Sequence, residues 1–186
     1  HEPYLIDFNE KNGTDLKTAA YIHYEPLALF PGKTKAIADL KEGAQIGVPN
    51  DATNEARALL LLQDQGLIKL QEGADLNATN LDSVEKPKNL EIMEIDAAQL
   101  ARSLQDLDMA VINGNYALQA GLNAKTDGLA METEDSLAGK TYANIVAVRN
   151  GDENREEIKT LIEVLSSDQV KNFMEEKYQG SVVPVF

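Results

Sequence analysis

The sequence predicts an α/β protein in which crossing strands join two lobes. Strand-like and helix-like segments alternate along most of the 186 residues, a pattern typical of α/β proteins. The region from about residue 30 to 143 contains successive strand–helix units, enough for one compact lobe. The flanking segments would then meet in a second lobe. Such an architecture has a hinge, and its cleft is where a small ligand would bind.

The predicted strands are short runs of apolar and β-branched residues. Pro26 and Pro31 limit any helix in the first of them, which is rich in Ala, Tyr, Ile and Leu. The expected strands cover residues 18–30, 44–48, 90–95, 109–112, 145–148 and the extended tail 182–186. The polar stretch 122–141 is predicted to be a loop.

The predicted helices show apolar residues at helical spacing, or a good cap followed by strong helix formers. Tyr4, Leu5 and Phe8 form such an apolar face near the start of the chain. A second helix opens near Asp51, directly after a strand, and ends before a glycine. The expected helices cover residues 3–12, 37–40, the stretch from Asp51 to 65, 97–107, 116–120, 153–165 and 168–178.

Composition argues against several classes of protein. Lys and Arg total 17 against 31 Asp and Glu, a formal charge of −14, which disfavours binding to nucleic acid or to an anionic membrane surface. Solubility alone is the simpler explanation of this charge. The absence of Cys excludes disulfides and thiolate chemistry. No apolar run approaches the ~18 residues that a membrane span requires.

The sequence contains no convincing catalytic constellation. Neither His1 nor His23 has a partner at metal-ligand spacing, and there is no glycine-rich phosphate loop or nucleophile elbow. Carboxylates are too abundant in this chain for a pair of them to be informative. The sequence therefore predicts no catalytic residue, metal or cofactor, and no enzymatic activity.

Three polar residues are candidates for binding a small ligand. Arg57 lies within about two turns of the helix opening near Asp51, where free N–H groups attract an anion, although a surface arginine paired with Asp51 or Glu55 is the simpler interpretation. Asn113 ends a buried strand, a common ligand position that is as often a plain turn. Asn144 precedes the last predicted strand and is equally consistent with a hinge residue.

Longer segments carry a family resemblance. They occur in order and at fitting intervals, and read IHYEPLALF (22–30), GVPNDATNEARALLLLQDQGLIKL (47–70), AVINGNYALQAGL (110–122), YANIVAVRNGD (142–152) and EEKYQGSVVPVF (175–186). Together they closely resemble the NlpA-type family of methionine-binding lipoproteins, over essentially the whole chain. The chain departs from the family at Glu55 and Ala56, where glycines often precede the arginine.

The resemblance implies a periplasmic-binding-protein-like (type II) hinge fold of two α/β lobes. Residues 1–28 would belong to the first lobe, 29–143 would form the second, and 144–186 would return to the first. The family's mature chain begins well before the position of His1. The amino-terminal part of one lobe, with the lipid-modified Cys, is therefore expected to be missing from this chain through cleavage or omission.

The resemblance also assigns roles to site residues. Arg57 would hold the ligand carboxylate, and Asn113 and Asn144 would bind its amino and carboxylate groups. His1 and Tyr4 match positions around the thioether side chain. These roles agree with the chemistry of a zwitterion with an apolar tail, which needs a cation, oxygen acceptors and a polarisable wall.

The function that follows is capture of methionine outside the cell membrane and its delivery to an ABC permease–ATPase complex. A lipid anchor on the absent amino-terminal segment would hold the protein at the membrane, on the cell surface or in the periplasm. Two alternatives stay open. The ligand could be another amino acid or a methionine-containing dipeptide, or the protein could be a surface lipoprotein in adhesion or signalling.

Overall fold

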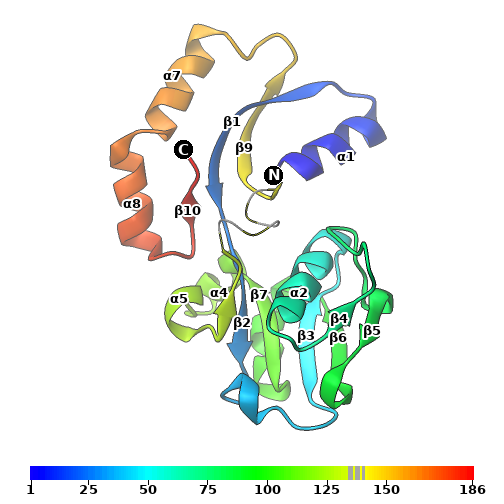
Figure 1. Ribbon diagram of the computed structural model, residues 1–186. Coiled ribbons are helices and arrows are strands. Elements are labelled where there is room, and N and C mark those ends of the chain that lie inside the picture. The colour runs from blue at the N-terminus through cyan, green and yellow to red at the C-terminus, as the bar shows by residue number, and fades with distance from the viewer. Residues whose placement is uncertain (134–135, 137–138, 140) are drawn as a thin grey trace. The chain divides into compact units, whose positions relative to one another are not determined.

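The computed structural model describes residues 1–133, 136, 139 and 141–186 (Figure 1). The chain divides into two compact units, one formed by 1–25 with 133–186 and the other by 26–132. Each unit contains both helices and strands, so the α/β class is confirmed. The lobe boundaries expected after residues 28 and 143 stay predictions.

A five-stranded mixed sheet forms the centre of the 26–132 unit. Its strands lie in the order β6-β3-β7-β2-β8. Their bounds are β2 Leu27–Pro31, β3 Gln45–Pro49, β6 Glu91–Ile95, β7 Met109–Asn113 and β8 Ala130–Met131. Strand β3 runs parallel to both β6 and β7, whereas β2 is antiparallel to β7 and β8. The carboxyl ends of β3 and β7 therefore meet at one edge of the sheet.

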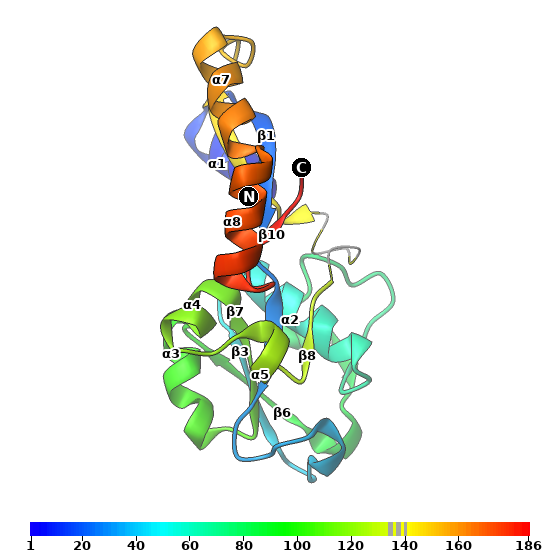
Figure 2. The same ribbon diagram turned by 90° about the vertical axis from the view of Figure 1, so that its left-hand side faces the viewer.

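Helices cover both faces of this sheet because successive strand residues point to opposite sides. The helices of this unit are α2 Ala52–Asp64, α3 Ala97–Ser103, α4 Gly114–Gln119 and α5 Ala124–Asp127. Leu27, Leu29 and Val111 belong to the apolar cluster that includes residues of α2, while Phe30 and Ile112 belong to the cluster formed with α3, α4 and α5. In Figures 1 and 2, α4 and α5 lie on one side of β2 and β7, and α2 lies on the other.

Short elements complete the 26–132 unit. A second sheet pairs β4 and β5 antiparallel. These elements are β4 Lys69–Leu70, β5 Ser83–Glu85 and the 3-10 turns η1 Ile37–Asp39, η2 Asn80–Asp82, η3 Pro87–Asn89 and η4 Leu104–Asp106.

The other unit is built on a three-stranded antiparallel sheet with β1 in the centre. Strand β1 pairs with β10 on one side and β9 on the other. The elements of this unit are α1 Glu2–Asn12, β1 Leu16–Tyr24, β9 Asn144–Arg149, α7 Glu156–Leu165, α8 Asp168–Tyr178 and β10 Val183–Pro184. Figure 1 shows α1 on the right of β1 and β9, and α7 and α8 on the left. None of the helices described is long and apolar enough to cross a membrane.

The structure corrects two sequence predictions. The single extended segment 18–30 is two strands, interrupted at Glu25 and Pro26 because proline has no N–H for a sheet ladder. The loop expected over 122–141 contains α5 and β8. Residues 134, 135, 137, 138 and 140 of that stretch lie outside the described residues.

Candidate functional site

The edge where β3 and β7 end carries Arg57 and Asn113, two of the polar residues that the sequence indicated. Strand β3 leads directly into α2, whose N-cap is Asp51, and the Asp51 carboxylate accepts a hydrogen bond from the Asn54 N–H at 3.1 Å. Arg57 follows in the second turn of α2 and belongs to the buried residues of that helix. Ligands of open α/β sheets bind at such strand ends.

Arg57 forms a buried ion pair with Glu132. Its Nη2 lies 2.6 Å and its Nε 3.1 Å from the two carboxylate oxygens, so the contact is bidentate. The two side chains are only 6% and 4% exposed. The interpretation of Arg57 as a surface residue is therefore wrong, because the arginine is buried against a carboxylate 75 positions away. Arg57 Nη1 also donates to Asn54 Oδ1 at 3.3 Å.

Glu132 also forms two hydrogen bonds with Leu27, the first residue of β2. Its Oε2 accepts the Leu27 N–H at 2.7 Å, and its own N–H donates to the Leu27 carbonyl at 2.9 Å. The N–H and C=O of Leu27 thus both point toward Glu132 and away from β7. Glu132 thus accepts two hydrogen bonds from Arg57 and one from Leu27.

Asn113 is the ladder partner of Leu27, the residue that Glu132 binds. It ends β7 directly opposite Leu27, and this is a non-hydrogen-bonded position of the ladder because Leu27 directs its polar groups to Glu132. Residues in such a pair have Cα atoms about 4.5 Å apart and neighbouring side chains. Val111, two positions before Asn113, lies in the α2-side core, so the Asn113 side chain points to the face that α2 covers.

The Asn113 side chain carries a buried oxygen that needs a donor. Its Oδ1 is shielded from solvent and has no hydrogen-bond partner among the residues that the structure describes. A buried acceptor without a donor costs free energy, which a ligand N–H group at this position would recover. The combination of Arg57 and the Asn113 oxygen offers one donor group and one acceptor on the same face of the sheet.

The two departures from the family pattern lie on the buried side of α2. Ala56 is fully buried, and Glu55 is 7% exposed. The Glu55 carboxylate accepts the Asn80 N–H at 2.8 Å, which attaches α2 to η2. Burial raises the pKa of Glu55 above its ordinary value, and the Asn80 hydrogen bond opposes this shift. Glu55 therefore has a structural partner of its own.

His1 and Tyr4 line an apolar pocket in the other unit. The pocket has a volume of about 270 Å³ and is completed by Leu5, Phe8, Leu16, Ile145 and Ala147. The His1 ring meets the Tyr142 ring edge-on, with centroids 4.9 Å apart, and Tyr4 is 63% exposed. Aromatic and aliphatic walls of this kind suit a thioether side chain.

Asn144 opens β9 opposite His23 of β1. The Asn144 Nδ2 lies 3.2 Å from His23 Nε2. This imidazole nitrogen also lies 3.1 Å from a Glu25 carboxylate oxygen. One imidazole nitrogen can accept from the amide or donate to the carboxylate, but not both at once. The orientation of the Asn144 amide is therefore coupled to the proton on His23.

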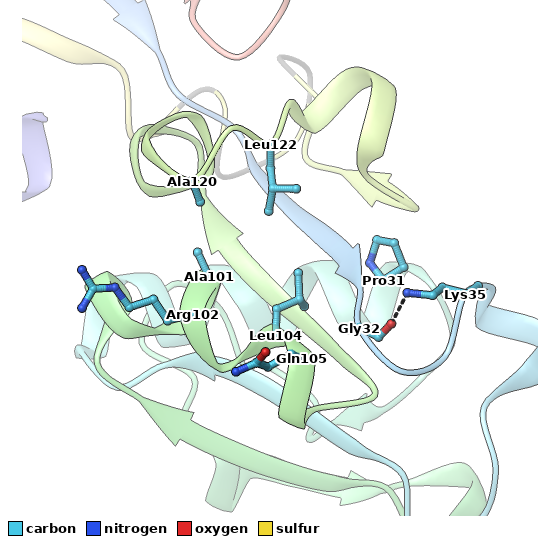
Figure 3. Close-up of a pocket in the computed structure, with 9 residues that line it drawn as sticks. All are labelled: Pro31, Gly32, Lys35, Ala101, Arg102, Leu104, Gln105, Ala120 and Leu122. Carbon is cyan, nitrogen blue, oxygen red and sulfur yellow. Dashed lines mark hydrogen bonds between the residues drawn. The ribbon is translucent and has the colours of Figure 1, made fainter.

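A further cavity, of about 530 Å³, lies on the α3 side of the 26–132 unit (Figure 3). Its charged lining residues, Lys35 and Arg102, lie at opposite ends, and Lys35 donates to the Gly32 carbonyl instead of pointing at a common centre. Without convergent polar groups this cavity is a poorer candidate for an amino-acid site than the Arg57 and Asn113 region.

Sequence reasoning missed Glu132 and His23 as parts of the candidate sites. Glu132 lies within the predicted loop and is one of many carboxylates, so no local pattern distinguishes it. His23 has no partner at metal-ligand spacing in the sequence, yet its ring contacts the Asn144 amide and the Glu25 carboxylate. The alternation of side chains along β7 does indicate the sheet face to which Asn113 points. The ion-pair partner of Arg57 is apparent only from the fold.

The chain is similar over its whole length to a family of lipoproteins. The family model described as NlpA lipoprotein matches residues 1–186. The chain is 38% identical over 183 residues to the membrane lipoprotein TpN32 of Treponema pallidum, and 40% identical over 185 residues to the D-methionine-binding lipoprotein MetQ of Escherichia coli. Each alignment covers 98% of this chain and 67% of the relative, so the chain spans about two thirds of their length.

Solved structures also match this chain over its whole length. The structure of a nutrient-binding protein from Burkholderia cenocepacia bound to methionine is similar to this chain, with a TM-score of 0.88 and 44% identity. The match covers all of this chain and 77% of that one. The chain therefore has the fold of this methionine-bound protein, as the family resemblance implies.

Proposed function

Because the chain belongs to the NlpA lipoprotein family, we propose that it serves as the methionine-binding component of an ABC importer. The family consists of substrate-binding proteins, and relatives of this chain carry methionine in their names or in their binding site. In this function the protein binds its ligand and releases it unchanged.

The unsatisfied Asn113 oxygen on the sheet face that α2 covers is the observation that carries the proposal. A free amino acid presents a carboxylate, which an arginine binds through two parallel hydrogen bonds, and an ammonium group, which needs oxygen acceptors. Arg57 supplies the first kind of partner and Asn113 Oδ1 the second. Both side chains belong to the same face of one sheet, at the strand ends where small ligands bind.

We propose further that the methionine thioether contacts the apolar pocket lined by His1 and Tyr4. Soft sulfur makes favourable contacts with aromatic rings, typically about 5 Å from the ring. The roles of His1, Tyr4 and Asn144 toward the ligand stay predictions that follow from the family resemblance.

The partner of the loaded protein would be an ABC permease–ATPase complex, which receives the amino acid. The relatives named above are lipoproteins, so we place the protein outside the cell membrane, held there by a lipid anchor. Ligand binding would favour one arrangement of the protein over others, and the permease would recognise that arrangement.

Isothermal titration calorimetry tests the proposal directly. L-methionine is titrated into the complete protein as its organism makes it, after bound ligand has been removed by unfolding and refolding. Saturable binding of one methionine per chain supports the function. No heat with methionine but heat with a methionyl dipeptide would replace methionine by the dipeptide as the ligand. No heat with any amino acid or dipeptide would refute a transport role.

A further inference from the structure

We infer that His23 and Glu25 orient the Asn144 amide so that its NH2 group, and not its oxygen, faces the ligand. This role for His23 rests on the proposed function, in which Asn144 binds the ligand. Asn144 is thereby assigned to the ligand carboxylate, because an amide NH2 donates hydrogen bonds and a carboxylate accepts them. His23 is a positioning residue, which acts on the ligand only through Asn144.

A β-bulge in β1 places the His23 side chain opposite Asn144. Tyr21 pairs with Ile145 of β9, whereas His23 pairs with Asn144. Ile22 is therefore the additional residue of the bulge, and a regular ladder would place this buried apolar side chain opposite Asn144. Bulges are common beside functional sites, where they re-aim a side chain. This one brings an imidazole to the amide.

The Glu25 carboxylate determines which imidazole nitrogen carries the proton. Glu25 Oε1 lies 3.1 Å from His23 Nε2, within hydrogen-bond distance. A carboxylate only accepts hydrogen bonds, so the contact is favourable when Nε2 carries a proton and repulsive when Nε2 presents its lone pair. Among the residues that the structure describes, none forms a hydrogen bond with His23 Nδ1 and draws the proton there.

A proton on Nε2 in turn fixes the Asn144 amide. The end of the amide that faces His23 lies 3.2 Å from Nε2. An NH2 group at this end would oppose the Nε2 proton with a second donor, whereas the amide oxygen would accept it. A half-turn of the amide exchanges its nitrogen and oxygen, so the hydrogen-bond partners decide which atom lies where. The favoured state has Oδ1 toward His23 and Nδ2 on the other side.

The other end of the Asn144 amide is available to a ligand. None of the described residues forms a second hydrogen bond with this side chain, and Asn144 is only partly buried. With Oδ1 held by His23, the available end offers N–H donors, which a carboxylate accepts in charge-assisted hydrogen bonds. An ammonium group would find no acceptor there, because it only donates.

NMR of the complete protein without ligand tests the orientation separately from methionine binding. Isotopically labelled histidine shows which ring nitrogen carries a proton, with the His23 signals identified through their connection to its backbone. At about pH 8, where free imidazole is neutral, we expect the proton on Nε2. An imidazolium would keep this donor as well, whereas a neutral ring with its proton on Nδ1 would overturn the inference.

The same spectra test the role of Glu25. In Glu25→Gln the share of the Nδ1–H form should rise, because a glutamine amide can donate to Nε2 and a carboxylate cannot. An unchanged share would show that Glu25 does not hold the proton on Nε2. This comparison needs only the wild-type protein and Glu25→Gln, so it remains decisive if variants at His23 fail to fold.

Calorimetry with L-methionine and its carboxamide tests the consequence for binding. The carboxamide carries an NH2 group in place of one carboxylate oxygen, and this group needs an acceptor where Asn144 offers a donor. The preference for the acid is the ratio of the two dissociation constants. In His23→Phe the amide can turn freely, so we expect this preference to fall by about three- to tenfold, the worth of one hydrogen bond. His23→Gln keeps an N–H donor and should retain the preference.

Lys17→Met is the matched control. It removes a donor from the other end of β1, where Lys17 pairs with Asp15 at 2.6 Å, and its preference should equal that of the wild-type protein. An unchanged preference in His23→Phe, or an equal fall in His23→Phe and Lys17→Met, would overturn the inference alone. A wild-type protein that binds no methionine would instead overturn the proposed function, while the NMR result would still decide the orientation of Asn144.

Discussion

Replacing Arg57 by methionine should destabilise the protein strongly, even in the absence of any ligand. The change leaves the Glu132 carboxylate buried, with the Leu27 N–H as the one remaining hydrogen bond of the three described above. Breaking one side of a buried ion pair costs about 3–5 kcal/mol. Since domains are stable by about 5–15 kcal/mol, this loss is a large fraction of the total.

A second substitution should restore most of the lost stability. In the double variant Arg57→Met with Glu132→Gln, no charge is buried, and the glutamine oxygen can still accept the Leu27 N–H. Neutral replacements of a buried ion pair are often close to neutral in stability. We therefore expect the double variant to lie within about 2 kcal/mol of the wild-type protein and well above the single variant.

Thermal unfolding followed by circular dichroism measures these differences. A loss of about 3–5 kcal/mol corresponds to a melting temperature lower by about 6–20 °C for a protein of this size. If the two units unfold separately, the shift should appear in the transition of the 26–132 unit, which contains both residues.

The exposed pair of Lys69 and Glu85 provides the control. Its side chains are 64% and 62% exposed at an N–O distance of 3.0 Å, so Lys69→Met should change the stability by less than about 1 kcal/mol. The reasoning is refuted if Arg57→Met costs no more than this control, or if adding Glu132→Gln makes the single variant still less stable.

Three further predictions concern single buried or half-buried groups. Asn113→Ala should weaken methionine binding at least about tenfold in calorimetry yet leave the melting temperature unchanged or higher, because it removes an unsatisfied buried oxygen; a lower melting temperature would contradict this. Burial raises the pKa of Glu55, so its contribution to stability is greatest below the ordinary value of 4.5 and is lost as pH rises through the folded-state pKa. Glu55→Gln should abolish that decline in urea unfolding measured above pH 4.5, and an unaltered pH profile would show that Glu55 does not cause it. The hydrogen bond from the Gln45 N–H lowers the pKa of Asp108. The stabilisation by Asp108 is therefore present above pH 3.8 and is lost as pH falls through the folded-state pKa. Asp108→Asn should reduce the loss of stability in acid, and an acid sensitivity equal to that of the wild-type protein would show that Asp108 contributes nothing.

The regular elements of the fold could be predicted because their signals are local. Tyr4, Leu5 and Phe8 mark α1 by spacing, and the caps after β3 mark the start of α2. The two-residue strand β8 has no such signal, since two residues are too few to show an alternating pattern. It exists because it pairs with β2, a partner about a hundred residues earlier in the chain.

The candidate site was only partly predictable for the same reason. Arg57 and Asn113 stand at strand and helix ends that the sequence marks, so their positions at the sheet edge followed from local patterns. The burial of Arg57 did not, because it depends on a carboxylate that the chain delivers from residue 132. In a chain with 31 acidic residues, composition cannot identify which one becomes the partner.

The double hydrogen bond between Leu27 and Glu132 also has a practical consequence for handling the protein. These two residues are almost the first and last of the 26–132 unit, so the chain enters and leaves that unit at neighbouring positions. A segment whose ends adjoin can be excised or circularly permuted with little strain, since a short artificial linker suffices to join them. Residues 26–132 are thus a natural module for separate expression, one that would keep Arg57, Asn113 and Glu132 together.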